Sequence, residues 1–217
     1  NAAKLISILH QSIIKSKIKS GNFFESGTYY GLSAAIFLNL ENINKGFLID
    51  VADYLEKEKL EKLSKSKFEF IKTKSEDFNF KMLGPKESIS WAHLDASHYF
   101  ENVKNEILNI IPFMNEYGLI CLDDWSNHYS QVRAAYYYLY FKEMIDWQLI
   151  LTGFNKAFLC KRENISFFSN SIINIFSNQL IANEEILDWQ LIRTEDHSDS
   201  RNFHIELVKG VGEGSKP

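Results

Sequence analysis

The sequence predicts an α/β protein in which a doubly wound, mostly parallel sheet carries helices on both faces. Strand-like apolar runs alternate with helical runs over the first 125 residues, and parallel neighbours require such crossover connections. Four of the apolar runs end in a carboxylate, at Glu25, Asp50, Asp95 and Asp123. Open α/β sheets bind ligands outside the carboxyl ends of their strands. These acids therefore favour a ligand with hydroxyls and positive charge, or a divalent metal, over a bare polyphosphate.

Strands and helices are expected in strict alternation up to the last of these acids. Leu5, Leu9 and Ile13 recur at helical spacing, and the N-terminal helix should end before residues 20–21. The first strand ends at Glu25. After it we expect helices at residues 32–40, 55–63 and 103–111, and strands at residues 46–50, 68–71, 89–95 and 119–123, the last entered through a turn at Tyr117 and Gly118.

The C-terminal third predicts antiparallel additions to the sheet. Residues 147–152 and 156–161 flank a Gly-Phe-Asn link, which is typical of a hairpin, and this edge hairpin brings the sheet to seven strands. Beyond it we expect a helix at residues 166–182 and a second edge hairpin made of residues 188–192 and 203–208.

Length and composition fit one domain, since 217 residues with 45% hydrophobic side chains can bury a single sizeable core. We expect this domain to span residues 1–209. It divides into an N-terminal helix at 1–20, a ligand-binding core at 21–161 and a C-terminal extension at 162–209. Residues 210–217, which contain glycine and serine, are expected to form a flexible tail.

Charge and cysteine content narrow the classes of partner. A net charge of −4 argues against a nucleic-acid surface, which needs a basic patch. Two cysteines in apolar runs imply no disulfide framework. We see neither an export signal nor an apolar stretch of bilayer-spanning length, so the expectation is a cytoplasmic protein without membrane contact.

The turn after the first strand discriminates between ligand classes. Dinucleotide-binding enzymes use G-x-G-x-x-G, in which the glycines let the backbone approach a pyrophosphate. Residues 25–33 instead read ESGTYYGLS, with bulky side chains where the second and third glycines would stand. A carboxylate followed by one close-approach glycine favours a ligand that has an ammonium group and no phosphates.

At these residues the chain resembles class I S-adenosylmethionine-dependent methyltransferases, especially the catechol-type and macrolide-sugar-type O-methyltransferases of small molecules. The resemblance covers residues 23–161 and implies a Rossmann-like fold. Residues 25–33 resemble the motif that holds the methionine part of the cofactor. Asp50, 23 residues after Gly27 (50 − 27), stands where the family's acid bridges the ribose hydroxyls, and residues 75–77 resemble the segment against the adenine.

The resemblance thus implies a set of cofactor-binding residues: Glu25, Gly27, Thr28, Tyr29, Ser33, Asp50, Ser75, Glu76 and Asp95. Taken singly, Gly27 could be a turn glycine, Asp50 a helix cap and Glu76 a surface acid. The inference rests on the ordered set.

A second constellation follows the fourth and fifth strands. Asp95, Asp123 and Asp124 should meet at the reactive end of the cleft, where like charges repel unless a cation lies between them. Mg²⁺ prefers such oxygen ligands, and the resemblance implies these three acids as its ligands. In the alternative reading, Asp124 caps a helix and Asp95 bonds backbone amides.

The general base departs from the pattern of both kinds of relative. Catechol-type enzymes have a lysine three residues after the first metal acid, and sugar-modifying enzymes have an aspartate two residues after it. This chain has His98 and Ser97 at those positions. Histidine titrates near neutrality and is a credible base, so His98 and Asp95 are the predicted catalytic residues. The departure leaves a metal-free reaction open.

The resemblance therefore implies transfer of a methyl group from S-adenosylmethionine to a hydroxyl of a small molecule, with Mg²⁺ assistance left open. A sugar, a phenol and other hydroxyls remain as acceptors, and the aromatic run at residues 136–140 together with the terminal hairpin would suit a homodimer. The alternatives are an NAD(P)- or nucleotide-sugar-binding Rossmann oxidoreductase and a cofactor-binding module without catalysis.

Overall fold

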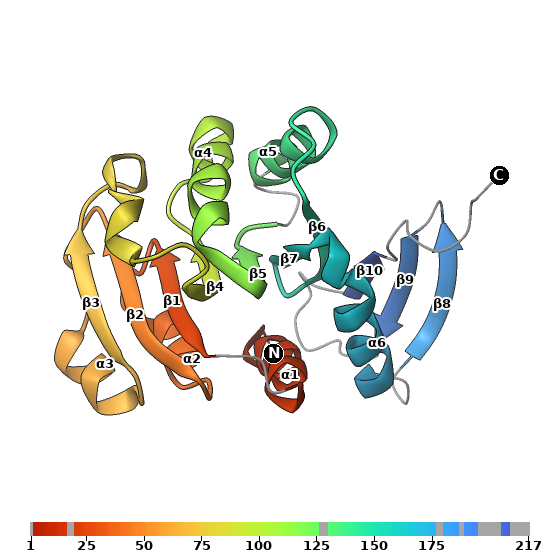
Figure 1. Cartoon of the computed structure of the whole chain (residues 1–217), viewed down its shortest axis with the longest axis horizontal. Coiled ribbons are helices and arrows are strands. Elements are labelled where there is room, and N and C mark those ends of the chain that lie inside the picture. The colour runs from red at the N-terminus through yellow and green to blue at the C-terminus, as the bar shows by residue number, and fades with distance from the viewer. Residues whose placement is uncertain are drawn as a thin grey trace.

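One sheet of ten strands forms the centre of the computed structural model, with helices on both of its faces (Figure 1). The structure describes residues 2–16, 20–125, 130–176, 180–186, 189–194 and 205–208. The helices are α1 (Ala2–Lys15), α2 (Leu32–Leu38), α3 (Lys57–Leu63), α4 (Phe100–Ile110), α5 (Ser130–Phe141) and α6 (Ile165–Phe176). The strands are β1 (Gly21–Ser26), β2 (Ile43–Asp50), β3 (Lys67–Lys72), β4 (Ile89–Leu94), β5 (Met114–Leu122), β6 (Trp147–Gly153), β7 (Lys156–Lys161), β8 (Leu180–Ile186), β9 (Trp189–Thr194) and β10 (Ile205–Val208).

The strand order is β3-β2-β1-β4-β5-β7-β6-β10-β9-β8. The first five strands in this order are parallel, and β7 joins β5 antiparallel as half of the β6–β7 hairpin. The chain builds outward from β1 to β3 and then returns to β4 on the other side of β1. The order therefore reverses between β1 and β4, which is where ligands bind in open α/β sheets. The predicted doubly wound, seven-stranded sheet is confirmed, and three further strands extend it.

Two cores flank the sheet because successive strand residues point to opposite faces. Phe23 of β1 packs with α1, α2 and α6, and its ring stacks on Phe37 with the centroids 4.5 Å apart. Phe24, the next residue, packs on the other face with α4 and α5. The predicted stripe of α1 is buried: Leu9 is fully inaccessible, and Leu5 and Ile13 are nearly so.

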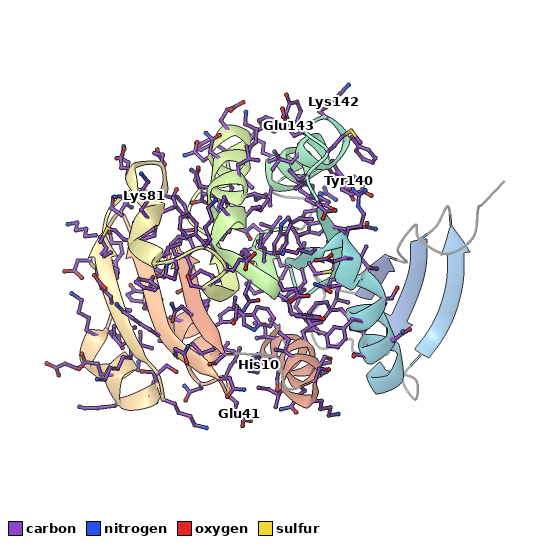
Figure 2. All side chains as sticks on the ribbon, in the orientation of Figure 1. His10, Glu41, Lys81, Tyr140, Lys142 and Glu143 are labelled. Carbon is purple, nitrogen blue, oxygen red and sulfur yellow. The ribbon has the colours of Figure 1, made fainter. Side chains whose placement is uncertain are left out.

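α1 is also fixed to the sheet by polar contacts. Nε1–H of Trp91 on β4 donates to Nδ1 of His10, and Nε2 of His10 lies 2.5 Å from the carbonyl oxygen of Glu41 (Figure 2). Nε2 therefore carries the ring proton, since Nδ1 already accepts. Burial lowers the pKa of His10, which keeps this bridge neutral.

Two expected boundaries were wrong. The helix predicted at residues 166–182 ends at Phe176, and Leu180–Ile186 instead forms β8, paired with β9. The stretch between 165 and 182 contains no glycine or proline to mark a stop. The predicted turn at Tyr117 and Gly118 lies inside β5, where the register against β4 is irregular.

The structure also bears on the predicted second hairpin and on the two cysteines. The second edge hairpin is confirmed by the antiparallel pairing of β9 with β10. Both cysteines are free and buried, as expected. The division into domain segments stays a prediction, and the tail at 210–217 lies outside the described residues. No helix in the described part of the chain has both the length and the apolar character to cross a bilayer.

Candidate functional site

A cavity of about 330 Å³ lies at the carboxyl ends of β1, β2 and β4, where the strand order reverses. Its lining consists of Gly27, Tyr29, Ile49, Asp50, Val51, Thr73, Ser75, Asp95 and Ala96. Five of the nine predicted cofactor residues are among them. The cavity therefore lies at the carboxyl ends of the strands, where a ligand was expected, and two of the strand-end acids, Asp50 and Asp95, line it.

Gly27 allows the ends of β1 and β4 to approach each other. Its φ of 82° lies in the left-handed region, and a Cβ built on it would stand 2.1 Å from the carbonyl oxygen of Asp95. Its N–H donates to the carbonyl oxygen of Ile49 on β2. This glycine thus serves strand-to-strand packing as well as a turn, a role that the sequence motif did not reveal.

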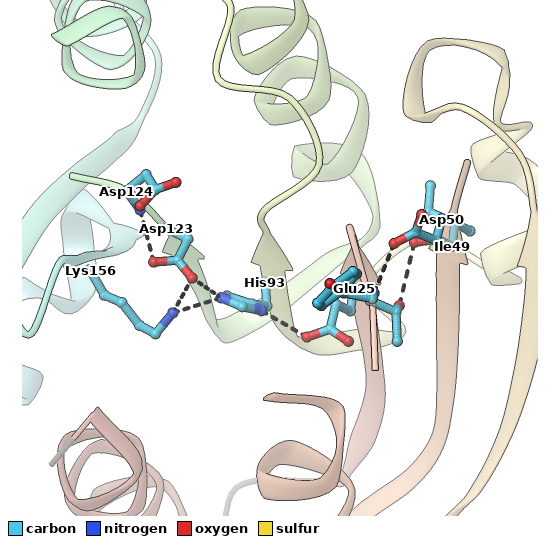
Figure 3. Close-up of polar contacts among 9 residues, drawn as sticks. Glu25, Ile49, Asp50, His93, Asp123, Asp124 and Lys156 are labelled. Carbon is cyan, nitrogen blue, oxygen red and sulfur yellow. Dashed lines mark hydrogen bonds and ion pairs between the residues drawn. The ribbon is translucent and has the colours of Figure 1, made fainter. Parts of the chain in front are cut away.

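Asp50 is held in place by the turn that it faces. Oδ2 accepts from the backbone N–H of Tyr29 at 2.8 Å (Figure 3), and Oδ1 accepts from that of Ala52 at 2.9 Å. Tyr29 has a φ of 48°, so this turn is strained and depends on the carboxylate. Each carboxylate oxygen can accept more than one hydrogen bond, so Asp50 keeps acceptor capacity toward the cavity.

Three predicted residues on this side do not line the cavity. Thr28 is buried, and its hydroxyl lies 3.4 Å from the carbonyl oxygen of Ile49. Ser33 is in the first turn of α2. Glu76 is exposed, and its Oε2 accepts from Nδ2 of Asn102 on α4 at 3.0 Å. Their assignment to the cofactor stays a prediction.

Glu25 is fully buried and does not line the cavity. Its Oε1 bonds Nδ1 of His93, the residue beside it on β4, at 2.8 Å (Figure 3). Oε2 is buried too, and no partner for it is found among the described residues. That oxygen remains available to a hydrogen-bond donor.

His93 connects Glu25 to two charged groups, the carboxylate of Asp123 and the ammonium group of Lys156. Its Nε2 lies 3.4 Å from Oδ2 of Asp123 and 3.1 Å from Nζ of Lys156 on β7. Lys156 is ion-paired with the same Oδ2 of Asp123. Neither His93 nor Lys156 was predicted as a site residue, because Lys156 is distant in sequence and His93 stands within an apolar run.

The electrostatics of this network follow from its pairing. Burial and the charge of Lys156 act to lower the pKa of His93, but hydrogen bonds to Asp123 and Glu25 outweigh them and raise it to about 9. Burial would raise the pKa of Asp123, and its bonds with His93 and Lys156 hold it well below its usual range. Burial and the neighbouring charge of Asp123 raise the pKa of Asp95 to about 8.

The predicted metal ligands are not brought together as one set. Among the described residues, two groups of side chains bring three ligand atoms within 4.8 Å of one another: Asp95 with His93 and Asp123, and Asp95 with His98 and Asp124. Asp123 and Asp124 thus fall in different groups. Asp124 has a φ of 53°, and its Oδ2 lies 3.0 Å from Nε2 of His98.

The donor sets can be tested for their fit to Mg²⁺. The group with Asp123 already contains a cation, because Lys156 is bonded to that carboxylate. Both groups include an imidazole, of His93 or of His98, and imidazole suits transition metals better than Mg²⁺. Neither group fits Mg²⁺ well, and its participation stays a prediction.

We expect the free energy of unfolding to fall as pH rises from about 6.5 to 9.5. His93 binds its proton more tightly when folded than when unfolded, where its pKa returns to 6.5. Its pairing with Glu25 and Asp123 is thus fully present below that value and is lost as pH rises through about 9. Ionisation of Asp95 near pH 8 adds a negative charge beside Asp123 and acts in the same direction, whereas Lys156 stays charged.

Thermal unfolding across this range measures the effect, and Tm should drop by about 5 °C or more. His93→Gln should have a lower Tm at pH 6.5 and a weaker dependence on pH. A Tm that is constant or rising in the wild-type protein would contradict the assignment.

The chain is similar to known proteins in part of its sequence and in its fold. Residues 24–125 match a family model described as a methyltransferase domain. No curated protein matches the chain in sequence.

Solved structures with a similar fold include three methyltransferases. The O-methyltransferase NovP is 13% identical with a TM-score of 0.58, covering 74% of this chain and 79% of NovP. A putative caffeoyl-CoA O-methyltransferase from Staphylococcus aureus is 16% identical with a TM-score of 0.56, covering 74% and 82%. An rRNA methylase from Streptococcus thermophilus is 15% identical with a TM-score of 0.53, covering 72% and 95%.

Proposed function

We propose that the chain is an S-adenosylmethionine-dependent methyltransferase that methylates a hydroxyl of a small molecule, since residues 24–125 match the model of a methyltransferase domain. The observation that best supports this proposal is the cavity where the strand order reverses, which is lined by Gly27, Asp50 and Asp95. NovP and the staphylococcal protein are named as O-methyltransferases, which supports oxygen as the acceptor atom. The net charge of −4 disfavours a nucleic-acid acceptor such as rRNA.

The cofactor would lie along the cavity with its ribose against Asp50. The carboxylate is fixed by the N–H groups of Tyr29 and Ala52, so it can accept from both ribose hydroxyls without reorganising. Ser75 lies in the wall assigned to the adenine. Oε2 of Glu25, for which the described part of the chain provides no partner, supports a donor such as the methionine ammonium at the end of β1.

Two groups of this chain would handle the proton of the acceptor hydroxyl. S-adenosylmethionine supplies an activated methyl group, so the protein has to align an oxygen in line with it and remove the proton. We assign proton uptake to His98, whose Nε2 faces Asp124. Asp124 is itself held by Nδ2 of Asn155, which donates to Oδ1 at 2.6 Å. A carboxylate so placed orients the imidazole and stabilises the imidazolium that forms.

Asp95 would take part from the cavity wall. Its pKa of about 8 leaves it largely protonated at neutral pH, so it can donate a hydrogen bond to the acceptor oxygen.

Calorimetry with S-adenosylmethionine and with NAD tests the cofactor assignment. The wild-type protein should bind S-adenosylmethionine and not NAD. Asp50→Ala should raise the Kd for S-adenosylmethionine by about 10- to 100-fold, because hydrogen bonds to a charged group contribute about 1.5–3 kcal/mol.

Asp53→Ala is the matched control, since Asp53 is exposed, lies three residues away and does not line the cavity. Its affinity should equal that of the wild type. Equal affinity in Asp50→Ala, or preferred binding of NAD, would contradict the assignment. If S-adenosylmethionine binds but no phenol or sugar hydroxyl in an acceptor panel is methylated, the protein binds the cofactor without transferring its methyl group to those acceptors.

A further inference from the structure

Next to the cavity, the carboxylate of Asp123 is paired with a cation of the chain itself, Lys156. Asp123 follows β5, and Lys156 is the first residue of β7. Antiparallel pairing sets Leu122 opposite Ala157, so the next pair along the ladder brings Asp123 beside Lys156. The N–H of Trp125 donates to the carbonyl oxygen of Asn155 and fixes the β6–β7 turn next to the acid pair. The lysine is therefore built into this place by strand register.

Both oxygens of Asp123 are engaged within the chain. Oδ1 accepts from the backbone N–H of Asp124 at 2.8 Å, and Oδ2 accepts from Nζ of Lys156 (Figure 3). The two side chains are mostly buried, with 16% of Asp123 and 12% of Lys156 exposed. Charges at such depth are stable only when paired. A divalent ion at Asp123 would have to displace the ammonium group or lie against it, and both are unfavourable.

We propose that Lys156 fills, at Asp123, the place that a divalent cation takes in metal-dependent O-methyltransferases. The inference deepens the proposed function and rests on it for its catalytic meaning. Lys156 is a positioning residue: it neutralises Asp123 and holds it against His93, and through Asp123 it sets the electrostatic potential at Asp95. Acceptor activation then depends on Asp95 and His98, without a metal ion at Asp123.

Mn²⁺ is the probe, and the signal of the free ion in electron paramagnetic resonance reports its binding without any methyl transfer. In the wild-type background, Asp123→Asn should leave the affinity for Mn²⁺ unchanged. Lys156→Met should strengthen Mn²⁺ binding at least tenfold, because it removes the ammonium group bonded to Oδ2 of Asp123 and leaves that oxygen open beside Asp95. Adding Asp123→Asn to Lys156→Met should abolish the gain. Lys161→Met removes a lysine from the other end of β7 and should show no gain.

Two results would overturn the proposal. One is tenfold or greater loss of Mn²⁺ affinity on Asp123→Asn in the wild-type background, which would mean that a metal competes with the lysine. The other is a folded Lys156→Met protein without any gain. Should Lys156→Met fail to fold, the comparison of the wild type with Asp123→Asn decides alone.

Calorimetry separates this inference from the proposed function. If the wild-type protein does not bind S-adenosylmethionine, the proposed function fails while the Mn²⁺ comparison still decides the role of Lys156. If it binds and methylates, the reaction rate should be the same in the presence of a chelator, and a rate that falls tenfold or more and is restored by Mg²⁺ would contradict the proposal.

Discussion

Replacing His98 by alanine should lower kcat by about 10²- to 10⁴-fold, the usual contribution of a general base. Affinity for S-adenosylmethionine should stay within twofold, because His98 does not line the cavity assigned to the cofactor. Its imidazole faces Asp124 at 3.0 Å, and that carboxylate is fixed by Asn155. Steady-state methyl transfer and calorimetry on the same preparations measure the two quantities.

Asp124→Asn provides the partner variant for His98→Ala. If the two residues act as a unit, the double variant should be little slower than His98→Ala alone, since groups of one catalytic unit are not additive. Tyr99→Phe, at the exposed next residue, is the neighbouring control and should keep the wild-type rate. An unchanged kcat in His98→Ala would remove His98 from the mechanism and leave Asp95 as the candidate for proton transfer.

Gly27→Ala should lower the free energy of unfolding by about 3 kcal/mol or more and abolish binding of S-adenosylmethionine. Two effects combine, because alanine is strained at a φ of 82° and its methyl group would stand 2.1 Å from the backbone oxygen of Asp95. Neither chain segment can yield easily, since β1 and β4 are adjacent strands in the middle of the sheet. Urea unfolding measures the loss of stability.

Gly84→Ala is the control that distinguishes backbone strain from the steric clash expected in Gly27→Ala. Gly84 also has a positive φ, of 98°, but a Cβ on it meets no atom within 4 Å. This variant should cost about 1–3 kcal/mol from backbone strain, because a φ of 98° with a ψ of −150° is a conformation that is essentially restricted to glycine, and it should keep cofactor binding. If both variants lose the same stability, the close approach at Gly27 carries no energetic weight.

The alternation of strands and helices could be predicted because each element carries its own pattern. Leu5, Leu9 and Ile13 mark α1, and two of the acids at strand ends, Asp50 and Asp95, mark the cavity. The end of α6 could not be found in this way, since nothing local stops the helix and the pairing of β8 with β9 decides where the strand begins. Pairing of this kind depends on tertiary context more than on propensity.

In the candidate site too, residues in local sequence motifs could be predicted, whereas a residue placed by strand pairing could not. Gly27 and Asp50 were found because the glycine turn and the acid after the second strand have a fixed spacing in the sequence. Lys156 was missed because its contact with Asp123 arises from the register of a hairpin that begins 24 residues later (147 − 123). Repulsion among the acids led to the prediction of a metal ion, whereas the structure places the ammonium group of Lys156 at Asp123.

The outermost strands have a consequence for how the chain folds. Thr152 of β6 pairs with Glu206 of β10, which lies 54 residues further along (206 − 152). The hairpin that carries Lys156 closes instead through a two-residue turn, Phe154 and Asn155. The entropy lost on loop closure grows with loop length, and distant pairings slow folding. During synthesis, we therefore expect the charged end of the cavity to assemble while the residues of β10 are still inside the ribosome, so that the outer strands join a site that has already formed.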